Sequence, residues 1–266
     1  MKVGIIGLGF VGNAIRMAFN VYSGITPLVL IDPAKGYNSS YEDLVKCTAV
    51  FVCVPSPQGD DGSCDTSILE DVLAKLRAVN FNGTIISKCT APPDAYARLN
   101  NEYLNLVHSP EFLTAANAVR DYAGGTFAFI GGREFDHINT AEKVIRLSQC
   151  SLESVYYCSI GEAALAKYAI NSFLATKVVF MNELYNVAKK SSLDYGKISA
   201  MIKADSRIGS SHLQVPGPDG AFGFGGACFP KDTSALLKTA EQQGVDMMVL
   251  DAAVKKNTFL RLTEPK

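Results

Sequence analysis

The sequence predicts an α/β fold in which a doubly wound parallel sheet is followed by an all-α domain with a long central helix. Up to about residue 160, short apolar runs alternate with amphipathic stretches, as in parallel sheets joined by crossover helices. The glycine motif GLGFVG, at residues 7–12, directly follows the first apolar run. Beyond residue 160 only helical periodicity remains. We therefore expect two domains, covering residues 1–160 and 161–266.

The individual elements follow from the same pattern. Six apolar runs without a polar alternate face predict strands covered on both sides, at 2–6, 27–31, 49–54, 84–87, 104–107 and 126–130. Amphipathic stretches between them predict helices over 12–22, 41–46, 68–79 and 135–148. The second domain is predicted as helices over 161–191, 194–203, 230–243 and 247–262. A glycine- and proline-rich loop at 205–226 is long enough to be functional.

Composition favours small-molecule chemistry over binding to nucleic acid or to a membrane. The 266 residues carry 25 basic and 26 acidic side chains, so no net positive charge attracts phosphate backbones or anionic lipid. The most apolar stretch, 163–181, contains Lys167, Asn171 and Lys177, which indicates a buried helix and not a membrane span. Seven cysteines without a CxxC pair, and a start without a signal-like leader, favour a cytoplasmic protein that has no metal site.

The glycine motif at the end of the first predicted strand indicates a Rossmann-type dinucleotide site. Such glycines permit a tight turn, close approach of a pyrophosphate and close packing of helix on strand. Asp32 follows Gly12 by 20 residues, where a carboxylate accepts hydrogen bonds from an adenosine ribose, so we predict NAD over NADP despite the nearby Lys35. The alternative is a glycine turn used only for packing. The motif predicts these cofactor-binding residues: Gly7, Gly9, Phe10, Val11, Gly12, Asp32 and Lys35.

A second dense motif, FGFGGACFPKD, occupies residues 222–232. Pro230 and Asp232 suit the first turn of a helix, so Cys228 should lie just before a helix N-terminus. That position and the neighbouring Lys231 favour a thiolate nucleophile, and the glycines would let a substrate approach the backbone. The alternative is a small cysteine buried in the core.

Polar residues also interrupt other apolar segments. Lys167 and Asn171 share one face of the predicted long helix, where they either contact substrate or serve local structure. In the structural alternative Lys167 extends to water and Asn171 caps a loop. Two further clusters, at 88–93 and 109–113, follow predicted strands, where ligand loops are expected; ordinary turns around proline are the alternative.

Taken in order, these segments resemble the UDP-glucose/GDP-mannose dehydrogenase family over nearly the whole chain. The similar motifs are GLGFVG, VPSP at 54–57, CTAP at 89–92, PEFL at 110–113, GE at 161–162, AKY at 166–168 with Asn171, NEL at 182–184, RIG at 207–209 and GFGGACFPKD. The resemblance implies two successive NAD-dependent oxidations at C6 of a sugar nucleotide, through a Cys228 thiohemiacetal and thioester. Because residues 205–209 look like those of UDP-glucose members, UDP-glucose is the expected substrate and UDP-glucuronate the product.

The resemblance also implies residue roles. It implies that Lys167 and Asn171 stabilise an oxyanion, which a cation and an amide donor are suited to do. The implied catalytic residues are Cys228, Lys167, Asn171, Asp232, Thr90 and Glu111. Further cofactor contacts are implied for Val54, Pro55 and Thr90. Substrate contacts are implied for Glu111, Phe112, Leu113, Lys167, Asn171, Arg207, Phe222, Gly223, Gly225 and Lys231.

The sequence departs from the family pattern in two respects. Ala115 stands where many members have a second glutamate, and members continue into a C-terminal α/β domain over the nucleotide, whereas this sequence ends at Lys266. We expect a homodimer built on the long helix, which is apolar on more than one face. The alternatives are a two-electron β-hydroxyacid-type dehydrogenase, which needs no cysteine, and a non-catalytic NAD-binding dimer module.

Overall fold

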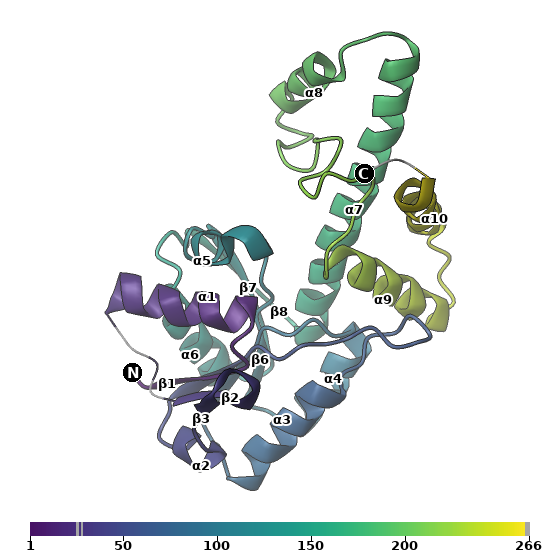
Figure 1. Cartoon of the computed structure of the whole chain (residues 1–266). Helices are drawn as coiled ribbons and strands as arrows, with labels where there is room; N and C mark the ends of the chain where they lie inside the picture. Colours follow the sequence, from purple (N-terminus) through teal and green to yellow (C-terminus); the bar gives the residue numbers. More distant parts are fainter. Residues whose placement is uncertain (25–26, 28, 264–266) are drawn as a thin grey trace. The chain divides into compact units, whose positions relative to one another are not determined.

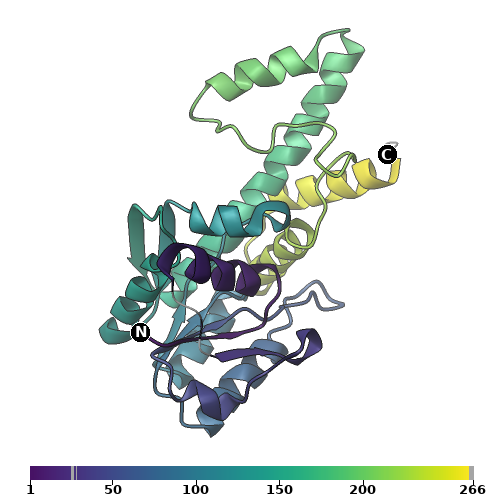
Figure 2. The ribbon, with the colours of Figure 1, turned by 60° about the vertical axis from the view of Figure 1, so that its left-hand side comes forward.

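The computed structural model describes residues 1–24, 27 and 29–263, which form two compact units (Figures 1 and 2). The sheet unit comprises Met1–Pro57 and Cys64–Lys167, and the helical unit comprises Gln58–Ser63 and Tyr168–Lys266. Each unit includes part of the long helix α7, Ile160–Lys190. None of the helices in the described part of the chain combines the length and apolarity that a membrane crossing requires.

The sheet unit is built on a mostly parallel sheet in the order β3-β2-β1-β4-β5-β6-β7-β8. The strands are β1 (Val3–Ile6), β2 (Val29–Asp32), β3 (Tyr37–Asn38), β4 (Ala49–Val52), β5 (Thr84–Ser87), β6 (Leu106–His108), β7 (Phe127–Gly131) and β8 (Ser154–Cys158). Within the described residues, β3 and β7 pair antiparallel, with β2 and β6 respectively. The order reverses between β1 and β4, and sheets of this class bind ligands beyond the carboxyl ends of the strands at such a reversal.

Helices cover both faces of this sheet (Figure 1). They are α1 (Phe10–Ala18), α2 (Tyr41–Leu44), α3 (Ser67–Ala78), α4 (Pro93–Glu102), α5 (Ala118–Ala123) and α6 (Phe135–Arg146). Strand β4 shows why the strands are apolar throughout. Its Val50 and Val52 pack in the core with α3 and α4, whereas Ala49 and Phe51 pack in the core with α1 and α6. The prediction of strands buried on both sides is confirmed for β1, β4, β5 and β6, whereas β2 and β7 are buried at only some of their positions.

The helical unit contains the rest of α7 together with α8 (Tyr195–Ala204), α9 (Phe229–Gln242) and α10 (Met248–Thr263). Its core joins α7 and α10 to two phenylalanines of the long loop, Phe222 and Phe224. Buried polar groups hold that loop in place. Lys177 donates to three of its carbonyl oxygens, and Asn257 both accepts from and donates to the backbone of Phe224. Polar residues inside these helices thus act as fixed supports for a segment without regular structure.

The predicted fold class is confirmed, and the six predicted strands coincide with observed strands apart from end residues. Part of the run at 27–31 lies outside the described residues, because Leu28 is not described. Among the strands and α-helices of the described residues, four were not predicted: β3, β8, α4 and α5. Edge strand β8 exposes Tyr156 and Tyr157 and so lacks an apolar run. Helix α4 begins at Pro93, so the alternative of an ordinary turn is wrong for Pro93, because proline fits the first helical turn.

Candidate active site

The glycine loop between β1 and α1 borders a cavity of about 850 Å³ in the sheet unit. Three of the predicted cofactor-binding residues, Gly9, Phe10 and Lys35, line it. A Cβ on Gly9 would meet no atom within 4 Å, whereas a Cβ on Gly12 would lie 1.9 Å from the carbonyl oxygen of Gly7. Packing therefore accounts for the glycine at position 12, whereas no protein atom accounts for the glycine at position 9. Since α1 begins at Phe10, its first N–H groups have no acceptor within the helix and suit a phosphate.

Asp32 and Lys35 both bind the peptide groups of Leu8 in this loop. The Leu8 N–H donates to Asp32 Oδ2 at 2.7 Å, and Lys35 Nζ donates to the Leu8 carbonyl oxygen. The two side chains thereby fix the loop that the cofactor would contact. Other predicted cofactor residues follow the carboxyl ends of the central strands: Val54 and Pro55 follow β4, and Thr90 follows β5. Val11 lies in the first turn of α1 and is partly buried.

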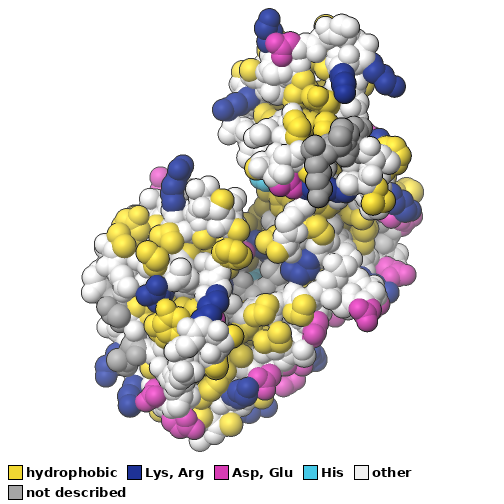
Figure 3. Space-filling view, viewed as in Figure 1, with side chains coloured by type: hydrophobic (Ala, Val, Ile, Leu, Met, Phe, Trp, Pro, Cys, Tyr) yellow, Lys and Arg dark blue, Asp and Glu magenta, His cyan; other side chains and the backbone are white. Residues whose placement is uncertain are grey.

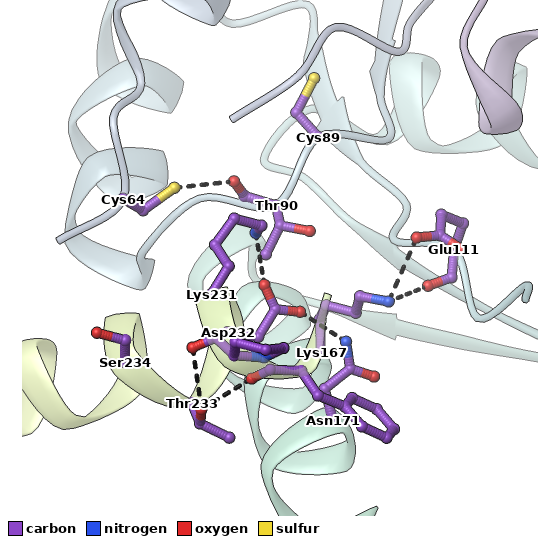
Figure 4. A network of polar contacts seen from close by, with 12 residues as sticks. Cys64, Cys89, Thr90, Glu111, Lys167, Asn171, Lys231, Asp232, Thr233 and Ser234 are labelled. Atoms are coloured by element: carbon purple, nitrogen blue, oxygen red, sulfur yellow. Dashed lines mark hydrogen bonds and ion pairs between the residues drawn. The ribbon is translucent and has the colours of Figure 1, made fainter. Parts of the chain in front are cut away.

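Lys167 is held inside the sheet unit, at 4% exposure. Its Nζ donates to the main-chain oxygen of Glu111 and lies 3.4 Å from Glu111 Oε1 (Figure 4). The other carboxylate oxygen of Glu111 accepts from the Leu113 N–H at 2.8 Å, and the Phe112 ring centroid is 5.0 Å from Lys167 Nζ. The alternative in which Lys167 extends to water is therefore wrong. An ammonium group held this way is a fixed positive charge that can stabilise a developing oxyanion.

The sheet unit contains a second buried lysine, Lys88. Lys88, at the end of β5, donates to Ser109 Oγ at 3.0 Å, and burial lowers its pKa to about 8. Lys88 also lines a cavity of about 210 Å³ with Glu111, Phe112 and Leu113, three of the predicted substrate residues. Sequence reasoning did not assign a role to Lys88, although a lysine that directly follows an apolar strand is an unusual signal.

His108, in β6, was also missed by sequence reasoning. It is fully buried, stacks on Tyr96 with ring centroids 4.2 Å apart, and places Nδ1 3.1 Å from the carbonyl oxygen of Ser87. Burial lowers its pKa to about 3, so the ring is neutral at physiological pH. The feature of the sequence that could have drawn attention to His108 is a polar residue at the end of an apolar run, which forms a fully buried strand.

The helical unit holds a separate buried ionic cluster. Asp232, 1% exposed, lies in the first turn of α9, where the helix dipole favours a carboxylate. Its Oδ2 accepts from Asn171 Nδ2 at 2.6 Å and its Oδ1 from Lys231 Nζ at 2.5 Å (Figure 4). Asn171 therefore orients on a carboxylate instead of capping a loop as the alternative had it. The Asn171 amide has a second N–H, and among the described residues only Asp232 accepts from this group.

Cys228 is the N-cap residue of α9 and is exposed. The main-chain N–H of Asp232 donates to the Cys228 carbonyl oxygen at 2.8 Å, so the two residues belong to the same helical turn. The alternative of a buried core cysteine is wrong. An exposed thiol at a helix N-terminus with a lysine three residues later is in the environment that favours a nucleophile.

The remaining predicted substrate residues have local structural roles. Phe222 is buried in the core, and Cβ atoms on Gly223 and Gly225 would each lie 2.3 Å from a side chain of α10, Asn257 and Arg261 respectively. These glycines are thus accounted for by packing. Arg207 is 88% exposed and pairs with Asp205 at 2.6 Å. Their contacts with substrate stay predictions.

These features define a class of protein: a dinucleotide-binding sheet unit followed by a helical unit with an exposed cysteine at a helix N-terminus. The chain belongs to the UDP-glucose/GDP-mannose dehydrogenase family. Residues 32–148 match the NAD binding domain of this family, and residues 161–258 match its central domain. The prediction of NAD as cofactor is confirmed by the first of these matches.

Individual relatives agree with this membership. UDP-glucose 6-dehydrogenase YwqF of Bacillus subtilis is 31% identical over 248 residues, covering 88% of this chain and 54% of the relative. UDP-glucose 6-dehydrogenase of Pseudomonas aeruginosa is 32% identical over 233 residues, covering 81% and 49%. The chain thus spans about half the length of the curated relatives that it matches.

Solved structures show the same fold. UDP-glucose dehydrogenase from Pyrobaculum islandicum matches with a TM-score of 0.78 at 25% identity, over 97% of this chain and 68% of that one. The 3-hydroxyisobutyrate dehydrogenase of Mycobacterium tuberculosis matches with a TM-score of 0.73 at 16% identity, over 97% and 93%. The second likeness shows that the chain shares its fold with a 3-hydroxyisobutyrate dehydrogenase.

Proposed function

We propose that this chain carries the NAD-dependent, four-electron oxidation of a sugar nucleotide, with UDP-glucose as substrate and UDP-glucuronate as product. The observation that supports this most is the exposed Cys228 on the helical turn that also holds Asp232, a buried carboxylate that accepts a hydrogen bond from Asn171 of α7. A dehydrogenase that oxidises an alcohol by two electrons and releases the carbonyl product has no use for a nucleophilic thiol. An oxidation that must retain an aldehyde between two hydride transfers does have such a use.

The first oxidation removes a hydride from C6 of the sugar and a proton from the C6 hydroxyl group, and the proton passes to water. Bound NAD would supply the acceptor for the hydride, and Gly9, Phe10 and Lys35 at the cavity beside the glycine loop would hold it. Lys167 and the second N–H of Asn171, four residues apart on α7, stabilise the oxyanion that develops as the proton leaves. Asp232 fixes the amide group that does this.

The second oxidation proceeds on the enzyme. The Cys228 thiolate would form a C–S bond to the aldehyde carbon while the C=O π bond breaks to give an oxyanion. Transfer of the C6 hydride from this thiohemiacetal to a second NAD, bound after the first NADH has left, would restore the C=O bond and give a thioester. Water then adds to the thioester, its proton passes to a carboxylate, and the C–S bond breaks to release the uronate and the thiolate. Asp232 and Glu111 are the proposed proton acceptors, because each carboxylate oxygen can accept more than one hydrogen bond. Thr90 is proposed to position the water.

The test is to count NADH formed per UDP-glucose consumed while assaying UDP-glucuronate. We expect two NADH per sugar, and we expect Cys228→Ser to lower release of the uronate by about 10³-fold or more because the thioester cannot form. Cys150→Ser, at another exposed cysteine, is the matched control and should leave both readings unchanged. One NADH per hydroxy acid, insensitive to Cys228→Ser, would instead support the two-electron alternative. NAD binding without turnover would support the non-catalytic module.

We also propose that the chain forms a homodimer through α7. Three large apolar side chains spaced by seven residues, Phe173, Phe180 and Val187, are 69%, 59% and 60% exposed on this helix. Hydrophobic side chains are visible at the surface of the helical unit between isolated charges (Figure 3). A seven-residue apolar repeat on one helix is suited to packing against a symmetry-related copy.

The location of the protein in the cytoplasm stays a prediction.

Light scattering at micromolar concentration tests this assembly. We expect a dimer for the natural sequence and a monomer for Phe180→Asp, because the carboxylate would be buried at the centre of the contact. Phe259→Asp, at a comparably exposed phenylalanine of α10, should remain dimeric. A monomeric natural sequence would contradict the proposal.

A further inference from the structure

Arg120, in α5, differs from the other seven arginines of the chain. Each of the others makes a hydrogen bond or an ion pair through its guanidinium. Over the described residues, no such partner exists for the Arg120 guanidinium, and its side chain is exposed. Arg120 instead lines the 850 Å³ cavity beside the glycine loop. A cation that faces a cavity without a protein partner is available to a ligand.

The charge of this cavity suits an anion. Its lining residues include Lys35 and Arg120 as cations and no carboxylate. Lys35 already donates to the Leu8 carbonyl oxygen, so Arg120 is the lining cation that the protein does not use. Across the same cavity lie Gly9 and the first turn of α1, whose N–H groups are directed to phosphate in dinucleotide-binding folds.

The fold brings Arg120 to this place although it lies 108 residues beyond Gly12 in the sequence. Helices α1 and α5 share one apolar core, in which Ala14 and Ala18 of α1 pack with Tyr122 and Ala123 of α5. The N-terminal turn of α5 and residues 115–117 before it consequently form a wall of the cavity. The glycine motif does not predict that residues 115–120 border the cavity, because these residues carry no phosphate-binding sequence pattern.

We propose that Arg120 binds the pyrophosphate of the dinucleotide, so that the phosphates lie between the glycine loop and α5. A guanidinium presents paired N–H donors that match two oxygens of a phosphate group. The proposal rests on the assignment of NAD as cofactor and is independent of which alcohol the enzyme oxidises. Arg120 acts here as a binding residue for the cofactor and takes no part in the transfer of hydride.

Calorimetric titration of the full chain with NAD, ADP and adenosine tests the proposal. We expect Arg120→Gln to raise the Kd for NAD and for ADP about tenfold, as for loss of a hydrogen bond to a charged group, and to leave adenosine unchanged. The matched control is Arg133→Gln, because Arg133 is exposed, pairs with Asn101 and lies outside the cavity lining. That variant should bind all three probes as the natural sequence does.

Three results would overturn the proposal. An unchanged Kd for ADP would show that Arg120 does not contact the pyrophosphate. An equal loss for adenosine would show a general disturbance of the site. A further titration with 2′,5′-ADP covers the third case, because an effect of Arg120→Gln confined to this probe would place the guanidinium at a 2′-phosphate instead. Failure of the sugar-nucleotide assay leaves these titrations interpretable, since ADP binding requires no turnover.

Discussion

The two glycine-rich loops of this chain, GLGFVG in the sheet unit and GFGG in the helical unit, look alike in sequence and differ in what approaches them. Gly9 of the first loop faces open space at the edge of a cavity. Gly223 and Gly225 of the second are approached by Asn257 and Arg261 of α10. Glycine density in a sequence therefore marks a close approach. Whether a ligand or the protein itself makes that approach depends on the tertiary structure.

The contrast also runs through the first loop. Gly12 is as crowded as Gly223, because its missing Cβ would overlap the carbonyl oxygen of Gly7. Within GLGFVG, close packing thus explains Gly12, and the approach of a ligand is the proposed explanation for Gly9. Substitution of single glycines by alanine separates these two causes, since crowded positions should lose stability and the open position should lose affinity.

The largest loss of stability is expected for Gly12→Ala. The new Cβ would lie 1.9 Å from a backbone oxygen, which no side-chain rotation can relieve. We expect the free energy of unfolding to fall by about 3 kcal/mol or more, as for severe overpacking. Urea unfolding followed by circular dichroism measures it. Gly161→Ala is the control, because its nearest neighbour would be 3.7 Å away, and the proposed cause fails if the two variants are equally stable.

Much of the fold could be predicted because the strands that carry it are fully buried. Strands β1, β4 and β5 are buried at every position, and β1 and β4 contain no polar side chain, so that a continuous apolar run is visible without knowledge of the partners. Edge strand β8 was missed because its outer face stays in water. Helix α4 was missed because prolines at its start are favourable there but disfavour helix elsewhere.

In the candidate site, too, some features could be predicted from the sequence and others could not. Lys167, Asn171 and Cys228 could be predicted because polar or reactive residues interrupted an apolar or glycine-rich pattern. The pairing of Lys167 with Glu111 could not, because it joins segments 56 residues apart. Nor could the position of Arg120 at the cavity, which depends on the packing of α5 against α1.

A smaller loss of stability is expected for Gly223→Ala. Its φ of +73° is strained for alanine, and the Cβ would lie 2.3 Å from Asn257 Oδ1, which is hydrogen-bonded to the Phe224 N–H. We expect unfolding of the helical unit to become easier by about 2–3 kcal/mol. Gly220→Ala separates the two causes, since Gly220 has a φ of +75° and open space around it. If both variants lose the same stability, crowding by α10 is not the reason for Gly223.

The two units should also differ in how their stability depends on pH. His108 of the sheet unit has its pKa lowered to about 3 by burial, against 6.5 for the free side chain. Below pH 6.5 the unfolded chain binds a proton that the native chain does not, so stability falls as pH falls from 6.5 toward 3. Between pH 7 and pH 5 the His108 contribution should fall by about 2 kcal/mol.

Urea unfolding at the two pH values checks this expectation. His108→Phe keeps an aromatic ring against Tyr96 and removes the titrating group, so it should be less sensitive to acid than the natural sequence. His212→Phe in the helical unit is the comparison, because that histidine is only partly buried and its pKa is lowered by a burial that is less complete. An unchanged pH dependence in His108→Phe would show that another group causes the acid loss.

Gly9→Ala should have the smallest effect on stability and the most specific effect on binding. Its Cβ would enter open space, and Gly9 already has extended backbone geometry that alanine adopts, so the free energy of unfolding should change by less than about 0.5 kcal/mol. The same Cβ would occupy the place where the pyrophosphate approaches the backbone, and we expect the Kd for NAD to rise about tenfold or more. Thermal unfolding and calorimetric titration on one preparation give both values. A variant that binds NAD normally would mean that the cofactor does not approach Gly9. The open space at Gly9 would then not distinguish a ligand-binding glycine loop from one filled by protein side chains.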